Sequence, residues 1–219
     1  MKNIMTKRFV LNAVAAALLL GSLSACIPLV VGGAVVSGTL VANDRRTSGA
    51  QLEDEGIELR SSSRIRSNVG DRVHVNVNSY NRQVLLTGEV PTAQDKLLVE
   101  QIVAKVENVT TVVNELAVMG SSSLTQRSSD VLVTGRVKAM LVDAKDLFAN
   151  SFRVVTERGT TYMMGRVTQR EADRGTAVAR GTPGVQKVVR IFEIISEEEL
   201  ARQLPTPAKP PAAKPATSN

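Results

Sequence analysis

Val84-Leu85-Leu86-Thr87-Gly88-Glu89-Val90 and Tyr162-Met163-Met164-Gly165-Arg166-Val167 are two copies of one pattern, an apolar strand followed by a glycine and a valine. Gly88 and Gly165 stand 77 residues apart, and a threonine that can begin a helix follows each copy. An internal repeat at a fixed distance predicts repeated structural units. We therefore expect two homologous modules. Each glycine is expected to permit a tight backbone path at the end of its strand.

The first module has the periodicities of helix, strand, strand, helix and strand, in that order. We expect a helix over 53–69, strands over 73–77 and 83–90, a helix that begins at Thr92, and a strand over 109–118. The first strand alternates valines with His74, Asn76 and Asn78, which predicts one buried and one polar face. Apolar residues at helical spacing predict the buried stripe of the second helix, namely Leu98, Ile102 and Val106.

The second module repeats this order. The buried stripe of its first helix is predicted to be Val133, Val137, Met140 and Leu141, followed by a strand over 152–156, a central strand over 162–167, a helix over 169–180 and a strand over 185–195. A final helical turn is expected at Glu197–Glu199. The fold class is thus α+β, in which each module is a three-stranded mixed sheet with two helices on one face and has its own core.

Composition divides the rest of the chain. We predict a signal peptide over 1–25, a lipidated tether over 26–50, the first domain over 51–118, a linker over 119–128, the second domain over 129–196 and a disordered Pro/Ala/Lys tail over 197–219. The apolar run 27–42 is shorter than the roughly 20 residues that a membrane-spanning helix needs. We expect this run to lie near the lipid headgroups or to form a flexible tether.

Cys26 is the only cysteine in the chain, so no disulfide can form within it. Basic residues and an apolar segment precede it, as in an export signal. The alternative is an ordinary signal cut after Ala25, with Cys26 incidental. Leu23-Ser24-Ala25-Cys26 resembles a lipobox, and this resemblance implies acylation of Cys26. Ile27 follows it instead of an inner-membrane retention aspartate, so the resemblance implies the periplasmic face of the outer membrane.

Charge differs between the two modules. Residues 51–118 hold seven basic and ten acidic side chains, a net charge of −3, whereas residues 119–195 hold twelve basic and seven acidic, a net charge of +5. A basic surface at a membrane attracts anionic lipid. The predicted lipid-binding residues lie on the first helix of the second module: Val131, Leu132, Arg136, Lys138 and Val142. Two alternatives are a solvated basic face without a ligand, and packing of these apolar residues against the first module or the linker.

Catalytic chemistry has little support in the sequence. His74 is the only histidine and is expected on the polar face of its strand. No His/Cys pattern has the spacing of a usual zinc site, and no glycine-rich phosphate loop or nucleophile elbow is present. We therefore expect no catalytic residue, metal, cofactor or small-molecule substrate. Nucleic acid is not expected as a partner of an exported protein.

The repeat resembles the BON domain, on the two glycine-containing stretches and the helix and valine-rich strand that follow each. The run Asp44-Arg45-Arg46-Thr47-Ser48-Gly49, with Asp54 and Ile57-Glu58 behind it, resembles the run that opens many BON-domain lipoproteins. With the lipobox, the chain resembles the dual BON-domain outer-membrane lipoproteins over residues 26–195. This resemblance implies phospholipid binding and support of outer-membrane integrity, without catalysis. The alternative is an envelope scaffold that binds outer-membrane or cell-wall-associated proteins.

Overall fold

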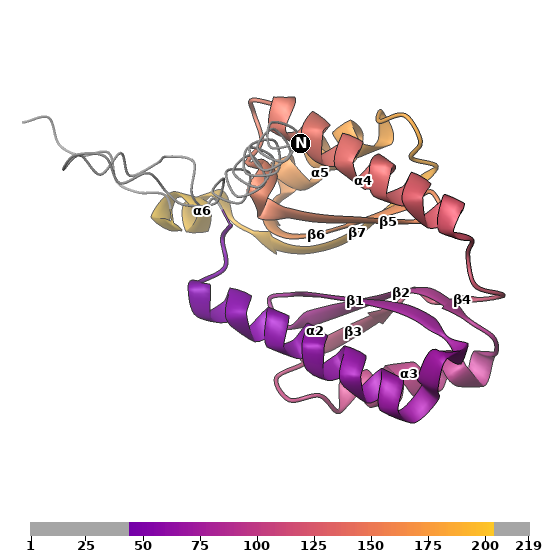
Figure 1. Cartoon of the computed structure of the whole chain (residues 1–219). Coiled ribbons are helices and arrows are strands. Elements are labelled where there is room, and N and C mark those ends of the chain that lie inside the picture. Colours follow the sequence, from indigo (N-terminus) through magenta and orange to yellow (C-terminus); the bar gives the residue numbers. More distant parts are fainter. Residues whose placement is uncertain (1–43, 204–219) are drawn as a thin grey trace, which may run out of the picture. The chain divides into compact units, whose positions relative to one another are not determined.

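The computed structural model describes residues 44–203 (Figure 1). Cys26, the predicted signal peptide and most of the predicted tail lie outside the described residues. Within the described part of the chain, none of the helices combines the length and the hydropathy needed to cross a bilayer.

The first module contains the five predicted elements. Helix α2 spans Ser48–Val69 and is followed by a short turn, η2, over Gly70–Arg72. Strands β1 (His74–Tyr80) and β2 (Gln83–Val90), helix α3 (Ala93–Ala104), and strands β3 (Thr111–Asn114) and β4 (Ala117–Val118) follow. Strand β2 is central, pairing antiparallel with β1 and parallel with β3 and β4. The predicted strand over 109–118 is thus two short strands, interrupted at Glu115 and Leu116.

The second module repeats this topology. Its elements are α4 (Leu124–Asp143), η3 (Ala149–Ser151), β5 (Phe152–Glu157), β6 (Thr160–Thr168), α5 (Gln169–Arg180) and β7 (Lys187–Ile195), and α6 (Glu197–Gln203) follows. Strand β6 is central, antiparallel to β5 and parallel to β7. Helix α4 begins within the range expected as linker, because Ser123 caps it by accepting a hydrogen bond from the backbone N–H of Gln126.

The helices of each module cover one face of its sheet (Figure 1), and the predicted core lies between them. Ile57, Ile65 and Val69 of α2 pack with Val84 and Leu86 of β2 in the first module. Val133, Val137 and Leu141 of α4 pack with Met163 and Val167 of β6 in the second. The α+β fold with two tandem mixed sheets is therefore confirmed, and in the first sheet β3 and β4 together take the place of the third strand.

The opposite faces of the two central strands are also buried. Tyr80 and Leu85 of the first module form one apolar cluster with Tyr162, Met164 and Ile191 of the second. Successive side chains of a strand point to opposite faces, so Leu85 and Met164 cannot reach the helix-side cores of their neighbours Leu86 and Met163. The modules have separate cores, as expected, but they also share a third cluster that sequence analysis did not anticipate.

Steric crowding explains why glycine occupies the two repeat positions, 88 and 165. Gly88 has φ of +113°, and a Cβ there would lie 2.1 Å from the carbonyl oxygen of His74. A Cβ at Gly165 would lie 2.4 Å from the carbonyl oxygen of Ser151. Both separations are far below van der Waals contact, so any side chain would push the paired strand away. The predicted tight backbone path is present at both positions.

The buried sides of helices α3 and α4 differ from the predicted ones. In α3 the buried apolar side chains are Val99 and Val103, whereas Leu98 is 37% exposed and Ile102 only partly buried; Val106 is buried but follows the helix. Apolar residues occupy both adjacent ridges of α3, so spacing alone did not fix which ridge faces the sheet. In α4, Met140 is 44% exposed, because the narrow buried stripe is centred on Val137 and Leu141 and leaves Met140 at its rim.

Candidate functional site

Helix α4 presents an unusual amount of apolar surface. Five of the twelve exposed large hydrophobic side chains in the described part of the chain lie on it: Leu124, Val131, Leu132, Met140 and Val142. Val131 is 70% exposed and Leu132 is 62% exposed. Helix α2 is two residues longer and exposes two such side chains, Leu52 and Leu59. Exposed apolar surface concentrated in this way is typical of a contact with a membrane or a protein.

The predicted lipid-binding residues are all exposed but lie on two rows of α4. At about 100° per residue, Val131, Lys138 and Val142 form one row, and Leu132 and Arg136 form another with Met140. The first row lines a cavity. The second lies toward the loop after α5, since a Cβ at Gly184 would be 3.7 Å from Arg136 Nη1. The structure thus brings each cation next to an apolar residue within its own row.

Some basic residues of the second module form ion pairs with the first module, whereas others form none within the part of the chain that the structure describes. Arg153 binds Glu58 of the first module at 2.8 Å, and Arg158 lies 3.5 Å from Glu89. The opposite charges of the modules therefore serve partly to join them, a role that the sequence analysis did not consider. Among the described residues, Arg136 and Lys138 take part in no ion pair. Their charges remain available to a partner outside the chain.

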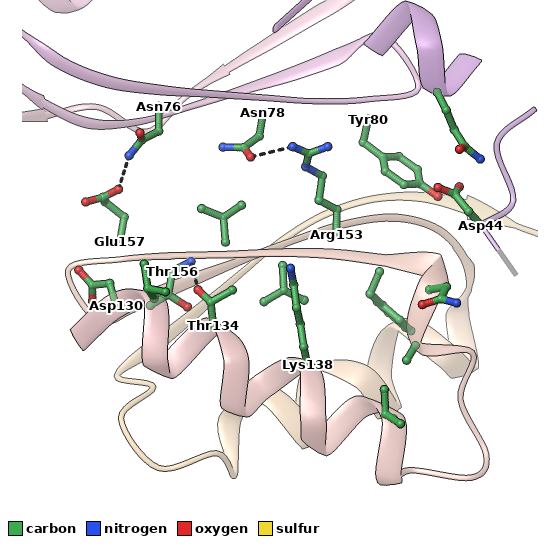
Figure 2. A pocket seen from close by; sticks show the side chains of 18 of the residues that line it. Asp44, Asn76, Asn78, Tyr80, Asp130, Thr134, Lys138, Arg153, Thr156 and Glu157 are labelled. Atoms are coloured by element: carbon green, nitrogen blue, oxygen red, sulfur yellow. Dashed lines mark hydrogen bonds between the residues drawn. The ribbon is translucent and has the colours of Figure 1, made fainter. Parts of the chain in front are cut away.

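A cavity of about 880 Å³ lies between β1 of the first module and the α4 and β5 elements of the second. Figure 2 shows Asn76, Asn78 and Tyr80 on one side of it, and Arg153 and Glu157 facing them. Asn76 Nδ2 donates to Glu157 Oε2 at 2.8 Å, and Arg153 Nη2 donates to Asn78 Oδ1 at 3.1 Å. The polar face predicted for β1 is present, but it faces this cavity and the other module.

His74 lines the cavity and lies beside two carboxylates, those of Glu89 and Glu157. Its Nδ1 is 2.9 Å from Oε2 of Glu89 on the neighbouring strand. Burial raises the pKa of Glu89, but hydrogen bonds from His74 and Ser122 outweigh burial and hold that pKa below its ordinary value. Burial raises the pKa of Glu157 above its ordinary value, and the nearby charge of Glu89 adds to this effect. Sequence spacing gave no sign of this group, because its members come from both modules.

The run 44–46 forms buried ion pairs. Its sequence had suggested only a resemblance and did not predict these contacts. Nη1 and Nη2 of Arg45 each donate to the Glu171 carboxylate of α5 at 2.7 Å. The Arg45 and Glu171 side chains are 5% and 1% exposed. Arg46 binds Asp54 at 2.7 Å and lies over the ring of Tyr80, at 4.3 Å from its centroid. The segment that enters the first module is thus fastened to both modules.

Comparison with known proteins identifies the repeat. The BON domain matches residues 53–120 and 129–195. The chain is 35% identical over 185 residues to outer membrane lipoprotein DolP of Haemophilus influenzae, a match that covers 82% of this chain and 95% of that protein. It is 29% identical over 154 residues to a 21 kDa hemolysin of Actinobacillus pleuropneumoniae, covering 69% of this chain and 79% of that protein.

Among solved structures, the C-terminal domain of CdsD, a structural protein of the type III secretion system of Chlamydia trachomatis, matches at 13% identity. The match covers 61% of this chain and 96% of that one, with a TM-score of 0.28, which is too low to bear on function. The family evidence comes from the two matched segments and from the relative at 35% identity. The resemblance inferred from the glycine repeat is confirmed: the chain belongs to the BON-domain family, with two BON domains in tandem, and is a homologue of an outer membrane lipoprotein.

Proposed function

We propose that the protein binds anionic phospholipid membranes through α4 of its second BON domain and thereby supports outer-membrane integrity, without catalysis. The observation that carries this proposal is the pairing of unengaged cations with exposed apolar side chains on one helix. Arg136 and Lys138 take part in no ion pair among the described residues, and Val131, Leu132 and Val142 are each more than 60% exposed. Anionic headgroups would attract the cations, and the apolar side chains would insert shallowly.

The test is co-sedimentation of residues 44–203 with phosphatidylglycerol-containing and neutral vesicles. Each cation near an anionic surface contributes about 1 kcal/mol, so Arg136→Glu with Lys138→Glu should weaken binding by at least about thirtyfold. The salt dependence of binding should largely disappear as well, because screening acts on the Coulomb attraction. Leu132→Asp should weaken binding while leaving much of the salt dependence.

A matched control is the pair Arg180→Glu with Lys187→Glu, which changes the charge of the same domain equally at exposed positions that are not on α4. This variant should retain most of its binding. If both double variants lose affinity equally, the helix-specific proposal fails and only the net charge of the domain matters. If neither does, crosslinking to a defined envelope protein becomes the better experiment, because a scaffold role would then be favoured.

The membrane anchor is a separate part of the proposal and lies outside the described residues. We propose that Cys26 is acylated after removal of residues 1–25, so that the residues from 26 up to the folded run that begins at Asp44 form a lipidated tether to the outer membrane. The lipobox-like stretch 23–26 and the homology to an outer membrane lipoprotein support it. Feeding cells a clickable fatty acid should label the wild-type protein and not a Cys26→Ser variant. Equal labelling of the two proteins would contradict the proposal.

A further inference from the structure

We propose that His74, Glu89 and Glu157 form a site for one divalent transition-metal ion, with zinc as the best fit, shared by the two BON domains. Each of the three side chains offers a ligand atom, and these atoms all lie within 4.8 Å of one another. His74 comes from β1, Glu89 from β2 and Glu157 from β5. This inference is independent of membrane binding by α4.

Glu89 has a buried carboxylate oxygen that is suited to bind a cation. Its side chain is fully buried, and its Oε1 accepts no hydrogen bond within the described region. Oε1 has only a long ion pair with Arg158 Nη1, at 3.5 Å, among the described residues, and Oε2 is already engaged by His74 and Ser122. A buried carboxylate oxygen without a proton donor is costly. A metal ion bound beside it would compensate the charge directly.

The donor set suits zinc. One imidazole nitrogen and two carboxylate oxygens are ligands that zinc takes at about 2.0–2.2 Å, with water able to fill a fourth position. At that bond length, tetrahedral ligand atoms are roughly 3.4 Å apart, so the present separations, which are at most 4.8 Å, must change by no more than about 1.4 Å. The ion would replace the present contact between His74 Nδ1 and Glu89. The Arg158 side chain is 40% exposed, so it can move away from Glu89 toward solvent.

The surroundings allow entry and hold the ligands. His74 and Glu157 line the cavity of about 880 Å³, which gives an ion a path to them. Asn76 donates to Glu157 Oε2, and Ser122 donates to Glu89 Oε2. Partners of this kind orient metal ligands. Because ligands from both domains meet at one ion, metal binding would stabilise the contact between the domains.

The experiment uses the full chain in detergent, purified without a polyhistidine tag and stripped with a chelator. Titration calorimetry with zinc chloride should give one bound ion per chain, and zinc should raise the melting temperature. His74→Ala and Glu157→Gln should each weaken binding more than about tenfold, since loss of even a supporting residue costs about 10–100-fold. Glu107→Gln, at a surface carboxylate that is 61% exposed, is the control and should bind like the wild type.

Circular dichroism and a cooperative melt without metal establish that each variant is folded. If a variant fails this check, Glu157→Asp, which keeps the carboxylate, replaces Glu157→Gln and should also weaken binding. The proposal is overturned if the wild type binds no zinc in equimolar amount. It is also overturned if zinc binds the folded His74→Ala and Glu157 variants as tightly as the wild type, because the ion would then lie elsewhere.

Discussion

Replacing Arg45 with alanine is expected to lower the free energy of unfolding by about 3–5 kcal/mol, since it leaves the buried Glu171 carboxylate without its cation. Arg45 binds both oxygens of Glu171 at 2.7 Å and also donates to the carbonyl oxygen of Arg166 at 2.9 Å. Burial raises the pKa of Glu171, but the hydrogen bonds from Arg45 and Thr168 outweigh it and keep that pKa below the ordinary value. Urea unfolding followed by circular dichroism measures the loss.

A double-mutant cycle separates this pair from general damage. Glu171→Gln retains an oxygen for the backbone N–H of Thr168, which caps α5. We expect the double variant Arg45→Ala/Glu171→Gln to be at least as stable as Arg45→Ala alone, because the unpaired buried charge is gone. Asp146→Ala is the control: it breaks an α5 ion pair with Arg174 whose side chains are about half exposed, and it should cost less than about 1 kcal/mol. Equal costs at the two sites would contradict a special role for Arg45.

Asp54→Asn is expected to cost about 3–5 kcal/mol at neutral pH, because it removes a buried carboxylate that binds both Arg46 and the backbone of a turn, and leaves Arg46 with only its pair to Asp44 among the described residues. The Asp54 carboxylate accepts four hydrogen bonds of 2.7–2.8 Å, from the Ser79 hydroxyl, the Arg46 guanidinium and the backbone N–H groups of Asn81 and Arg82. An amide offers one accepting oxygen, and its NH₂ group cannot accept. Asn81 and Arg82 have φ of 50° and 67°, so the lost bonds also supported a strained turn.

The same substitution should change the response to acid. Burial raises the pKa of Asp54, but the hydrogen bonds from Ser79, Arg82, Arg46 and Asn81 outweigh it and lower the folded-state pKa. Asp54 therefore stabilises the fold above its unfolded pKa of about 3.9, and this contribution is lost as the pH falls through the folded-state value. The stability difference between the wild type and Asp54→Asn should narrow below about pH 4. A constant difference down to pH 2 would exclude this explanation.

Asp130→Asn provides a matched control in the second domain. Asp130 lies 76 residues after Asp54 and accepts hydrogen bonds from the backbone N–H groups of Arg158 and Gly159 in the equivalent turn. Among the described residues it has no ion pair, so its substitution should cost less than that of Asp54. If Asp130→Asn is the more damaging change, the turn contacts dominate and the ion pair with Arg46 contributes little.

Much of the fold was predictable because repeats and periodicities are local signals. The boundaries of α5, the central position of β6, and the steric role of Gly88 and Gly165 follow from the sequence. The exposure of Val131, Leu132 and Val142 also followed, since they fall off the buried stripe of α4. The errors at Leu98 and Met140 have one cause: where apolar residues cover adjacent ridges, only the packed sheet selects the ridge that is buried. The Asp54 and Asp130 turn contacts were missed, although their spacing of 76 residues repeats that of the modules.

The sequence by itself determined the two BON modules, the order of elements in each and the exposed helix α4. Only the tertiary structure decided what lies between the modules: the shared cluster of Leu85 and Met164, the bond from Arg45 to Glu171, and the meeting of His74 with Glu157. The physical reason is that a strand alternates between two faces, and period alone shows which residues share a face. What covers that face depends on another part of the chain, which no local pattern encodes.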